Sequence, residues 1–249
     1  MQTGRVVVVT GGGRGIGEAI SRAFHEQGDR VAILSRHHAG LATVLGERAI
    51  HVVTDVTSSE SVRRALTAVV AWGGTIDVVV NNAGQSAWRP LEQIDDAFWA
   101  SMMAVNLTSV LHVCREASPH LRAGSAIINV SSLAGKRGSA SNAAYCAAKF
   151  GVNGLTQSLA KELGSRGIRV NAVCPVYVDT AGVREALEDS RSPARGDDVS
   201  TYLADFARSQ AALMRLPLAE EVAQACVMLS SASAVTGQCI NVDCGVLPS

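Results

Sequence analysis

The sequence has few charged residues, no net charge and few aromatic residues. Only 18% of its 249 residues are charged, Lys+Arg and Asp+Glu balance at 22 each, and aromatic residues make up 4%. A balanced charge offers no electrostatic attraction to nucleic acid or to an anionic membrane, so neither partner is expected. The hydrophobic content of 47% is too high for a disordered chain. A length of 249 residues suits one α/β domain or two small ones, and we expect a single domain over residues 1–249.

The chain also lacks the usual cysteine motifs. Its six cysteines form no C-x-x-C pair, and His37-His38 has no partner motif, so no metal is expected. Most of the cysteines lie in apolar stretches of the sequence, which predicts buried free thiols. Free thiols persist in a reducing cytoplasm. The N-terminal part, with its apolar run Val6 to Val9, has no signal-peptide layout, and no apolar run appears long enough to cross a bilayer. We expect a cytoplasmic protein.

Short apolar runs alternate along the chain with amphipathic stretches of helix length. Runs that are apolar throughout are typical of parallel strands buried on both faces. This order predicts an α/β fold with a single doubly wound parallel sheet of the Rossmann type and helices on both faces. The predicted strands are 6–9, 31–34, 50–53, 76–80, 126–130, 169–173 and 239–242, and the predicted helices are 16–27, 59–71, 97–121, 143–163 and 220–229.

Residues 179–216 depart from this alternation. The middle of the segment, Glu188 to Asp198, is charged and turn-prone. Long insertions in compact domains are commonly lids or binding loops. We predict a substrate loop or lid here, and a solvated loop without a role is the alternative.

A glycine-rich turn, Thr10 to Gly17, follows the first predicted strand and opens the first predicted helix. Glycines let the main chain turn tightly and approach a pyrophosphate, and the N-terminus of the helix supplies N–H donors. The spacing is G-x-x-x-G-x-G, with Gly11, Gly15 and Gly17 in the three glycine positions. The turn predicts a dinucleotide site.

The end of the second predicted strand distinguishes the two nicotinamide dinucleotides. NAD sites usually place an acidic residue there, whereas an arginine can bind the additional phosphate of NADP. This chain has Ser35-Arg36 and no acidic residue, and Arg14 adds a second cation from the glycine turn. Because a guanidinium binds phosphate through charge-assisted hydrogen bonds, we expect NADP(H) in preference to NAD(H).

Tyr145 and Lys149 are four residues apart in a predicted helix, so they share one face of it. An ammonium beside a phenol favours the phenolate, and the spacing therefore predicts that the pKa of Tyr145 is lowered toward neutrality. A phenol with such a pKa can serve as a general acid or base.

Further motifs stand in a fixed order: Asp55-Val56, Asn81-Asn82-Ala83-Gly84 after the fourth strand, Asn106 in the long helix, and Ser132 thirteen residues before Tyr145. On these motifs and the glycine turn, the chain resembles the short-chain dehydrogenase/reductase family over essentially its full length. Within that family it looks most like the 3-oxoacyl-[acyl-carrier-protein] reductase type, including its closing segment Ile240 to Gly245.

The resemblance implies an oxidoreductase that reduces a ketone to a secondary alcohol. Ser132 would donate a hydrogen bond to the substrate carbonyl, Tyr145 would deliver the proton, and Lys149 would hold the nicotinamide ribose and keep the phenol acidic. Asn106 would anchor a water that carries protons out through Lys149; the alternative is that Asn106 simply binds a main-chain group. The motifs and the resemblance together assign cofactor binding to Gly11, Arg14, Gly15, Ile16, Gly17, Ser35, Arg36, Asp55, Val56, Asn82, Ala83, Gly84, Tyr145, Lys149, Pro175, Val178 and Thr180.

One position departs from the family pattern. Val176 follows Pro175 where the family usually has glycine. A β-branched residue does not readily adopt a positive φ, so we expect a shifted main chain beside the nicotinamide or a smaller substrate space.

The sequence leaves the substrate and two alternative functions open. A 3-oxoacyl thioester of a carrier protein or of CoA would need basic docking residues, for which Lys136, Arg137 and Arg195 are candidates. An NAD-dependent secondary alcohol dehydrogenase is the alternative activity, and a non-catalytic dinucleotide sensor is a third function. The family implies a homotetramer that pairs the helices carrying Asn106 and Tyr145, where Ala147, Ala148, Gly151 and Gly154 permit close approach.

Overall fold

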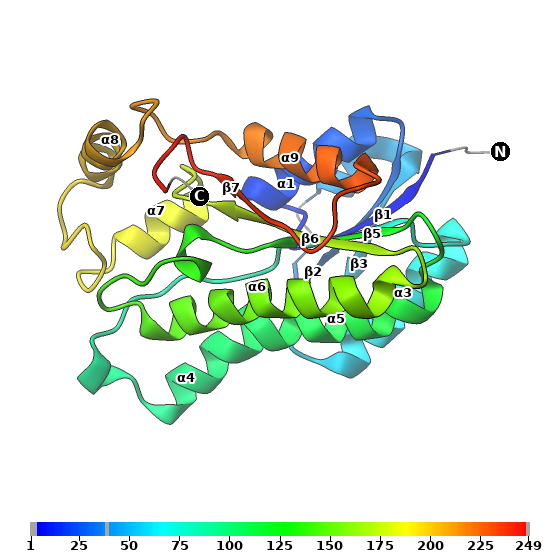
Figure 1. Cartoon of the computed structure of the whole chain (residues 1–249), viewed down its shortest axis with the longest axis horizontal. Coiled ribbons are helices and arrows are strands. Elements are labelled where there is room, and N and C mark those ends of the chain that lie inside the picture. Colours follow the sequence, from blue (N-terminus) through cyan, green and yellow to red (C-terminus); the bar gives the residue numbers. More distant parts are fainter. Residues whose placement is uncertain (1–3, 38–39, 248–249) are drawn as a thin grey trace.

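The strands lie in one parallel sheet, which a computed structural model describes for residues 4–37 and 40–247 (Figure 1). Within those residues the sheet has seven strands in the order β3-β2-β1-β4-β5-β6-β7, and the order reverses direction between β1 and β4. The predicted Rossmann-type sheet is confirmed. The strands are β1 Val6–Thr10, β2 Arg30–Ser35, β3 Ala49–Val53, β4 Val78–Asn81, β5 Ala126–Val130, β6 Arg169–Pro175 and β7 Cys239–Val242.

Helices cover both faces of this sheet because each central strand is apolar on both faces. Val6 and Val8 of β1 belong to one buried cluster, and Val7 and Val9 belong to the other. Figure 1 shows α1 and α9 on one face and α3, α5 and α6 on the opposite face. The α-helices are α1 Gly15–Glu26, α2 Leu41–Leu45, α3 Ser59–Gly73, α4 Asp96–Met103, α5 Ser109–Ala117, α6 Ala143–Gly164, α7 Ala181–Leu187, α8 Val199–Gln210 and α9 Ala219–Ser231.

The long helix predicted at 97–121 is interrupted. Between α4 and α5 the chain forms a π-helical turn, η3, over Ala104–Thr108. The whole stretch Asp96–His120 contains an 18-residue window of mean hydropathy 1.4, so the expectation that no apolar run could span a membrane is wrong by length and composition. In this fold the stretch packs against the sheet, with Val110, Val113 and Ala117 buried in the core. Shorter 3₁₀ turns are η1 Gly46–Arg48, η2 Leu91–Gln93, η4 Ser118–His120 and η5 Leu133–Gly135.

The segment predicted as a loop at 179–216 contains two helices. The Thr180 hydroxyl accepts a hydrogen bond from the main-chain N–H of Val183 and caps α7. The Asp198 carboxylate does the same for Thr201 at the start of α8, at 2.8 Å. The stretch between these helices and residues 211–216 after α8 match the predicted loop. Figure 1 shows α7 and α8 projecting beyond one end of the sheet.

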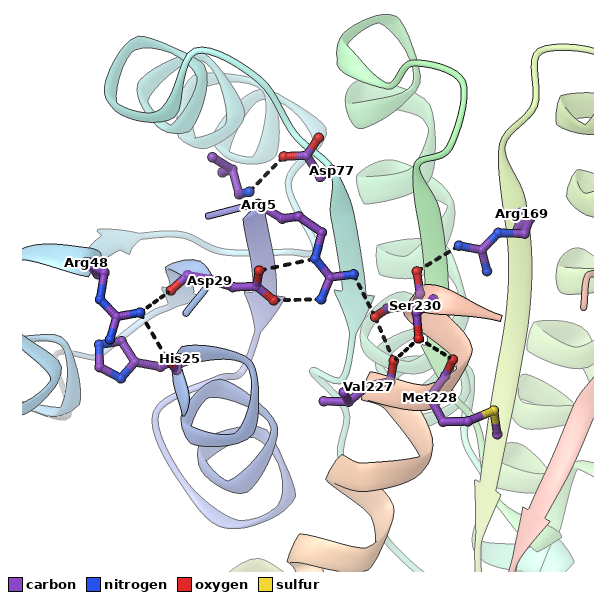
Figure 2. Close-up of polar contacts among 11 residues, drawn as sticks. Arg5, His25, Asp29, Arg48, Asp77, Arg169, Val227, Met228 and Ser230 are labelled. Atoms are coloured by element: carbon purple, nitrogen blue, oxygen red, sulfur yellow. Dashed lines mark hydrogen bonds and ion pairs between the residues drawn. The ribbon is translucent and has the colours of Figure 1, made fainter. Parts of the chain in front are cut away.

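The end of the sheet where the strands begin is closed by ion pairs and hydrogen bonds (Figure 2). The Arg5 guanidinium donates to both carboxylate oxygens of Asp29, at 3.1 and 2.7 Å, and to the Ser230 hydroxyl at 3.0 Å. Arg169 donates to the carbonyl oxygens of Leu229 and Ser230 at the end of α9. These contacts fix α9 to the strand starts.

Candidate active site

The opposite end of the sheet opens into a cleft of about 2010 Å³ that runs past the carboxyl ends of the strands. Ligands of open α/β sheets bind at this edge, where the strand order reverses. The cleft brings together all the residues expected to bind the cofactor: Gly11, Arg14, Gly15, Ile16, Gly17, Ser35, Arg36, Asp55, Val56, Asn82, Ala83, Gly84, Tyr145, Lys149, Pro175, Val178 and Thr180.

Three positions of the glycine turn favour glycine, two by main-chain conformation and one by lack of space. Gly11 has a φ of +63° and Gly15 a φ of +54°, which favour glycine. A β-carbon at Gly17 would lie 2.1 Å from the carbonyl oxygen of Gly11, closer than atoms can approach. The Asn82 amide braces the turn by donating to the carbonyl oxygens of Thr10 and Gly11, at 3.1 and 3.2 Å. The turn leaves bare main chain before α1, which fits a pyrophosphate.

Two arginines border this end of the cleft. Arg14 and Arg36 are exposed, and among the residues that the structure describes neither guanidinium makes a hydrogen bond or an ion pair. Asp55 lies close to Arg36: hydrogen bonds from the Thr57 hydroxyl and main-chain N–H lower the pKa of Asp55, and the Arg36 charge adds to this effect. The Ser35 hydroxyl donates to the carbonyl of His37 at 2.9 Å. The described end of β2 has no carboxylate that would repel a phosphate.

Ser132 and Tyr145 meet at the other end of the cleft. Both side chains line the cleft, Ser132 lies close enough to lower the pKa of Tyr145, and Tyr145 stands on the first turn of α6, partly buried. The Ser132 hydroxyl also accepts from the main-chain N–H of Ala134 at 3.1 Å, which fixes its position. Ser131 is 4% exposed and its hydroxyl donates to the carbonyl of Lys149. The geometry therefore favours Ser132 over its neighbour as the group that meets a ligand.

The pKa of Tyr145 differs from the expectation. Burial raises the pKa of Tyr145 to about 12, because the phenolate would lose solvation, and the hydrogen bond with Ser132 offsets only part of this effect. The same burial lowers the pKa of Lys149 to about 8. The Lys149 ammonium lies 5.6 Å from the centre of the Tyr145 ring and donates to the Val130 carbonyl at 2.9 Å. The predicted lowering of the pKa of Tyr145 is wrong for the protein alone.

Asn106 lies behind the cleft wall. Its side chain is fully buried in the π-helical turn η3, and its amide donates to the carbonyls of Gln85 and Met102, both at 3.0 Å. Its oxygen accepts from the main-chain N–H of Gln85 at 3.0 Å. These contacts match the alternative reading, in which Asn106 binds main-chain groups, and they hold the loop after Gly84 in place.

Val176 does not adopt a positive φ. Its N–H donates to the carbonyl of Val242 at 3.4 Å, so the residue continues the pairing of β6 with β7 beyond Pro175. Its side chain packs on a cluster that includes Leu133 and Cys174. The valine is thus accommodated by main chain that continues the strand, without the positive φ that a glycine would permit.

The three candidate docking cations do not share one position. Arg137 and Arg195 line the cleft. Lys136 lies outside the cleft lining, and its ammonium donates to the carbonyl of Cys239 at 2.6 Å. Lys136 is therefore not placed to attract an acidic partner at the cleft mouth.

The described residues contain no group of three or more His, Cys, Asp or Glu side chains that could hold a metal ion, and His38 lies outside them.

Further residues line the substrate end of the cleft. Tyr177 packs edge-on against Tyr202 and Phe206, with ring centres 6.1 and 4.9 Å apart. Trp88 and Asn142 also line the cleft and are almost fully buried. Asn142 lies three residues before Tyr145, and that spacing on a helix was the one signal that could have drawn attention to it.

Comparison with known proteins agrees with this site. The family model for short chain dehydrogenases matches residues 5–191. The 3-oxoacyl-[acyl-carrier-protein] reductase of Chlamydia muridarum is 35% identical, with 97% of each chain covered. The cis-4-hydroxycyclohexanecarboxylate dehydrogenase of Sinomonas cyclohexanicum is 39% identical, covering 97% of this chain and 96% of its own. A solved structure of an actinorhodin polyketide ketoreductase variant with NADPH superposes with a TM-score of 0.90 at 31% identity, covering 99% of this chain and 98% of that chain.

The family binds a nicotinamide dinucleotide, and the bare glycine turn and the cleft of this chain fit such a ligand. The agreement extends over nearly the entire chain and includes the resemblance to 3-oxoacyl-[acyl-carrier-protein] reductases. This protein therefore belongs to the short-chain dehydrogenase family and is an oxidoreductase that acts on a carbonyl or alcohol group.

Proposed function

We propose that this protein reduces a ketone to a secondary alcohol with NADPH, using Tyr145 as the general acid. The observation that carries the proposal is that Ser132, Tyr145 and Lys149 line one cleft, with the Lys149 ammonium 5.6 Å from the centre of the Tyr145 ring and Ser132 close enough to Tyr145 to lower its pKa. The bound nicotinamide would supply a hydride to the carbonyl carbon. The residues of the chain bind, orient and protonate the substrate.

Ser132 and Tyr145 would receive the carbonyl oxygen between their two hydroxyl groups. Both donors are positioned before the substrate arrives, so they can stabilise the negative charge that develops on this oxygen. A pKa of about 12 in the protein alone keeps Tyr145 protonated at neutral pH, so the phenol is ready to donate. The Lys149 ammonium has protons beyond the one given to Val130, and these would bind the ribose hydroxyls of the cofactor.

The preference for NADPH rests on Arg14 and Arg36. Both guanidiniums are exposed at the adenine end of the cleft, and the described end of β2 offers no carboxylate to bind the ribose hydroxyls of NADH. Arg36→Ala should raise the KM for NADPH by 10-fold or more and change the KM for NADH by less than about 3-fold. Equal losses with both cofactors would favour the NAD-dependent alcohol dehydrogenase instead.

The chemical test compares NADPH oxidation by the parent and by Tyr145→Phe. Acetoacetyl thioesters of CoA and of carrier protein, simple ketones and cyclic ketones form the panel, because the relatives include both a 3-oxoacyl-[acyl-carrier-protein] reductase and a cyclohexane dehydrogenase. Turnover by the parent and its loss, by about 100-fold or more, in Tyr145→Phe is the expected result. Tight NADPH binding without turnover of any substrate would point to a dinucleotide sensor.

We further propose a cytoplasmic homotetramer. All six cysteines are free thiols, which suits a reducing compartment. Trp99, Leu111 and Phe150 are 42%, 41% and 48% exposed on α4, α5 and α6, and they offer an apolar face to a second subunit. Of the small residues on α6, Ala148 is buried and Gly151 lies against Leu107 within the subunit, whereas Gly154 is exposed. Analytical ultracentrifugation that finds only monomer at micromolar concentration would refute the tetramer.

A further inference from the structure

Asn142 carries an unused hydrogen-bond acceptor in the cleft. The residue is 6% exposed, and its amide group donates to the Ser139 hydroxyl at 3.3 Å. Its side-chain oxygen is buried and has no hydrogen-bond partner among residues 4–37 and 40–247. Asn142, Ser139 and Tyr145 all line the cleft. An unpaired buried acceptor costs about 1–3 kcal/mol, so a residue that keeps one beside a reaction site is a candidate for ligand recognition.

The acceptor is not used by the helix that Asn142 begins. Asparagine is among the most favoured N-cap residues because its side-chain oxygen usually accepts from an N–H of the first turn. Asn142 is the N-cap of α6, yet its side chain makes no cap hydrogen bond. Its main-chain carbonyl takes the helical bond from the Cys146 N–H at 2.9 Å. The side chain is thus available for a contact outside the helix.

The turn before Asn142 is held in an uncommon conformation. Ser141 has a φ of +57°, which few residues other than glycine adopt. Its carbonyl accepts from the Arg89 N–H at 2.7 Å, which ties this turn to the loop before α4. Asn142 and Tyr145 are three residues apart at the start of α6, and both line the cleft. A group that reaches both would span only a few atoms.

We propose that Asn142 recognises a hydroxyl group on the carbon next to the substrate carbonyl. This inference rests on the proposed reduction by Tyr145 and names its substrate class: hydroxyketones, and in the reverse direction vicinal diols. A hydroxyl donates to the Asn142 oxygen and removes the unpaired acceptor. A 3-oxoacyl thioester has no donor beside its ketone, because its neighbours are methylene groups and a second carbonyl, so it leaves that acceptor unpaired.

The test compares cyclohexanone with 2-hydroxycyclohexanone, which differ by one hydroxyl. With NADPH, the parent should prefer the hydroxyketone by 10-fold or more in kcat/KM. Asn142→Ala should reduce this ratio to about 3 or less, and Asn142→Asp, which keeps an acceptor, should retain most of it. Ser58→Ala, which removes a helix cap on α3, is the matched control and should leave the ratio unchanged. An equal ratio in the parent and Asn142→Ala would overturn the proposal.

A binding measurement separates this proposal from the proposed reduction. Cyclohexanol and cis-cyclohexane-1,2-diol cannot be oxidised by the complex with NADPH, so their dissociation constants can be measured by calorimetry without turnover. The diol should bind the parent complex about 10-fold more tightly than the alcohol, and Asn142→Ala should remove the difference. Such a difference without any ketone turnover would refute the reductase and keep the hydroxyl site, whereas equal binding of diol and alcohol to the parent would refute the hydroxyl site.

Discussion

A β-carbon at Gly84 would come within 2.9 Å of the side-chain oxygen of Asn106. The same carbon would lie 3.7 Å from the Lys149 ammonium. Glycine is therefore required here by the Asn106 side chain, whereas the Lys149 ammonium is at an ordinary contact distance. At Gly84 the loop after β4 therefore lies against both the π-helical turn and the Lys149 ammonium.

Gly84→Ala should lower kcat/KM by at least 10-fold and destabilise the protein by about 1–3 kcal/mol, because Asn106 must move and lose hydrogen bonds to Gln85. Steady-state kinetics and urea unfolding check both effects. Gly164→Ala is the control: a β-carbon there meets no atom within 4 Å, and alanine at a helix end is neutral or stabilising by up to about 1 kcal/mol. Parent-like activity in Gly84→Ala would contradict this account of the loop.

Lys149→Met should stabilise the protein relative to the parent at neutral pH, and this gain in the free energy of unfolding should shrink as the pH rises. Burial lowers the pKa of Lys149 to about 8 from 10.5, so between these values the unfolded chain binds a proton that the folded chain lacks. The buried ammonium lowers the free energy of unfolding of the parent by its full amount below pH 8, and this loss disappears as the pH rises toward 10.5. The stability of Lys149→Met relative to the parent should therefore be about 2 kcal/mol greater at pH 7 than at pH 10.

Urea unfolding of both proteins at the two pH values provides this measurement. The Lys149→Met protein should have no reductase activity at either pH, since the ammonium is part of the proposed site. A stability difference that is the same at pH 7 and pH 10 would show that Lys149 keeps its ordinary pKa in the folded protein.

Cys239 should be the first cysteine to react with iodoacetamide at pH 7.5. A hydrogen bond from the Cys174 thiol lowers the pKa of Cys239, and the Lys136 charge contributes further. Burial instead raises the pKa of Cys114 and of Cys226 to about 12. Peptide mass spectrometry after brief labelling identifies the modified residue, and Lys136→Met should slow its labelling. Faster labelling of Cys244, whose pKa is raised, would be the contrary result.

Trypsin should cleave the turn between α7 and α8 more slowly once ligands are bound. Arg191 and Arg195 line the cleft in this turn, so a ligand that orders the turn removes the extended main chain that a protease needs. NADP⁺ together with a substrate alcohol should lengthen the half-life of this site severalfold. Cleavage after Arg63 in α3 serves as the internal reference, and an unchanged ratio of the two rates would argue against a lid.

The strands and the residues that line the cleft were predictable because they depend on local sequence. Short runs of β-branched residues such as Val6 to Val9 favour buried strands, and a glycine-rich turn between a strand and a helix favours a nucleotide. Helix α8 also had a local signal, an Asp198 cap followed by Val199, Leu203 and Ala207 at intervals of four, but the charged stretch before it concealed the pattern.

The remaining differences depend on packing between distant segments. The pKa of Tyr145 was expected to fall because Lys149 is four residues away, yet its sign is set by how much of the cleft wall excludes water, which no spacing along the chain reveals. The π-helical turn at Asn106 similarly arises where the side chain reaches Gln85 in another loop. Asn142 could be placed at a helix start, but its unused oxygen is visible only in three dimensions.

The π-helical turn separates the phases of the two helices that it joins. Each residue of an α-helix turns the chain by about 100°, so the additional residue in η3 rotates α4 by that angle relative to α5. Deleting one residue here would give a single regular α-helix through α4 and α5. Either Asn106 would then turn away from Gly84 or Val110 would leave the core. An insertion or deletion at this turn would therefore rotate α4 relative to α5 and disrupt the site, whereas a substitution in α4 leaves that rotation unchanged.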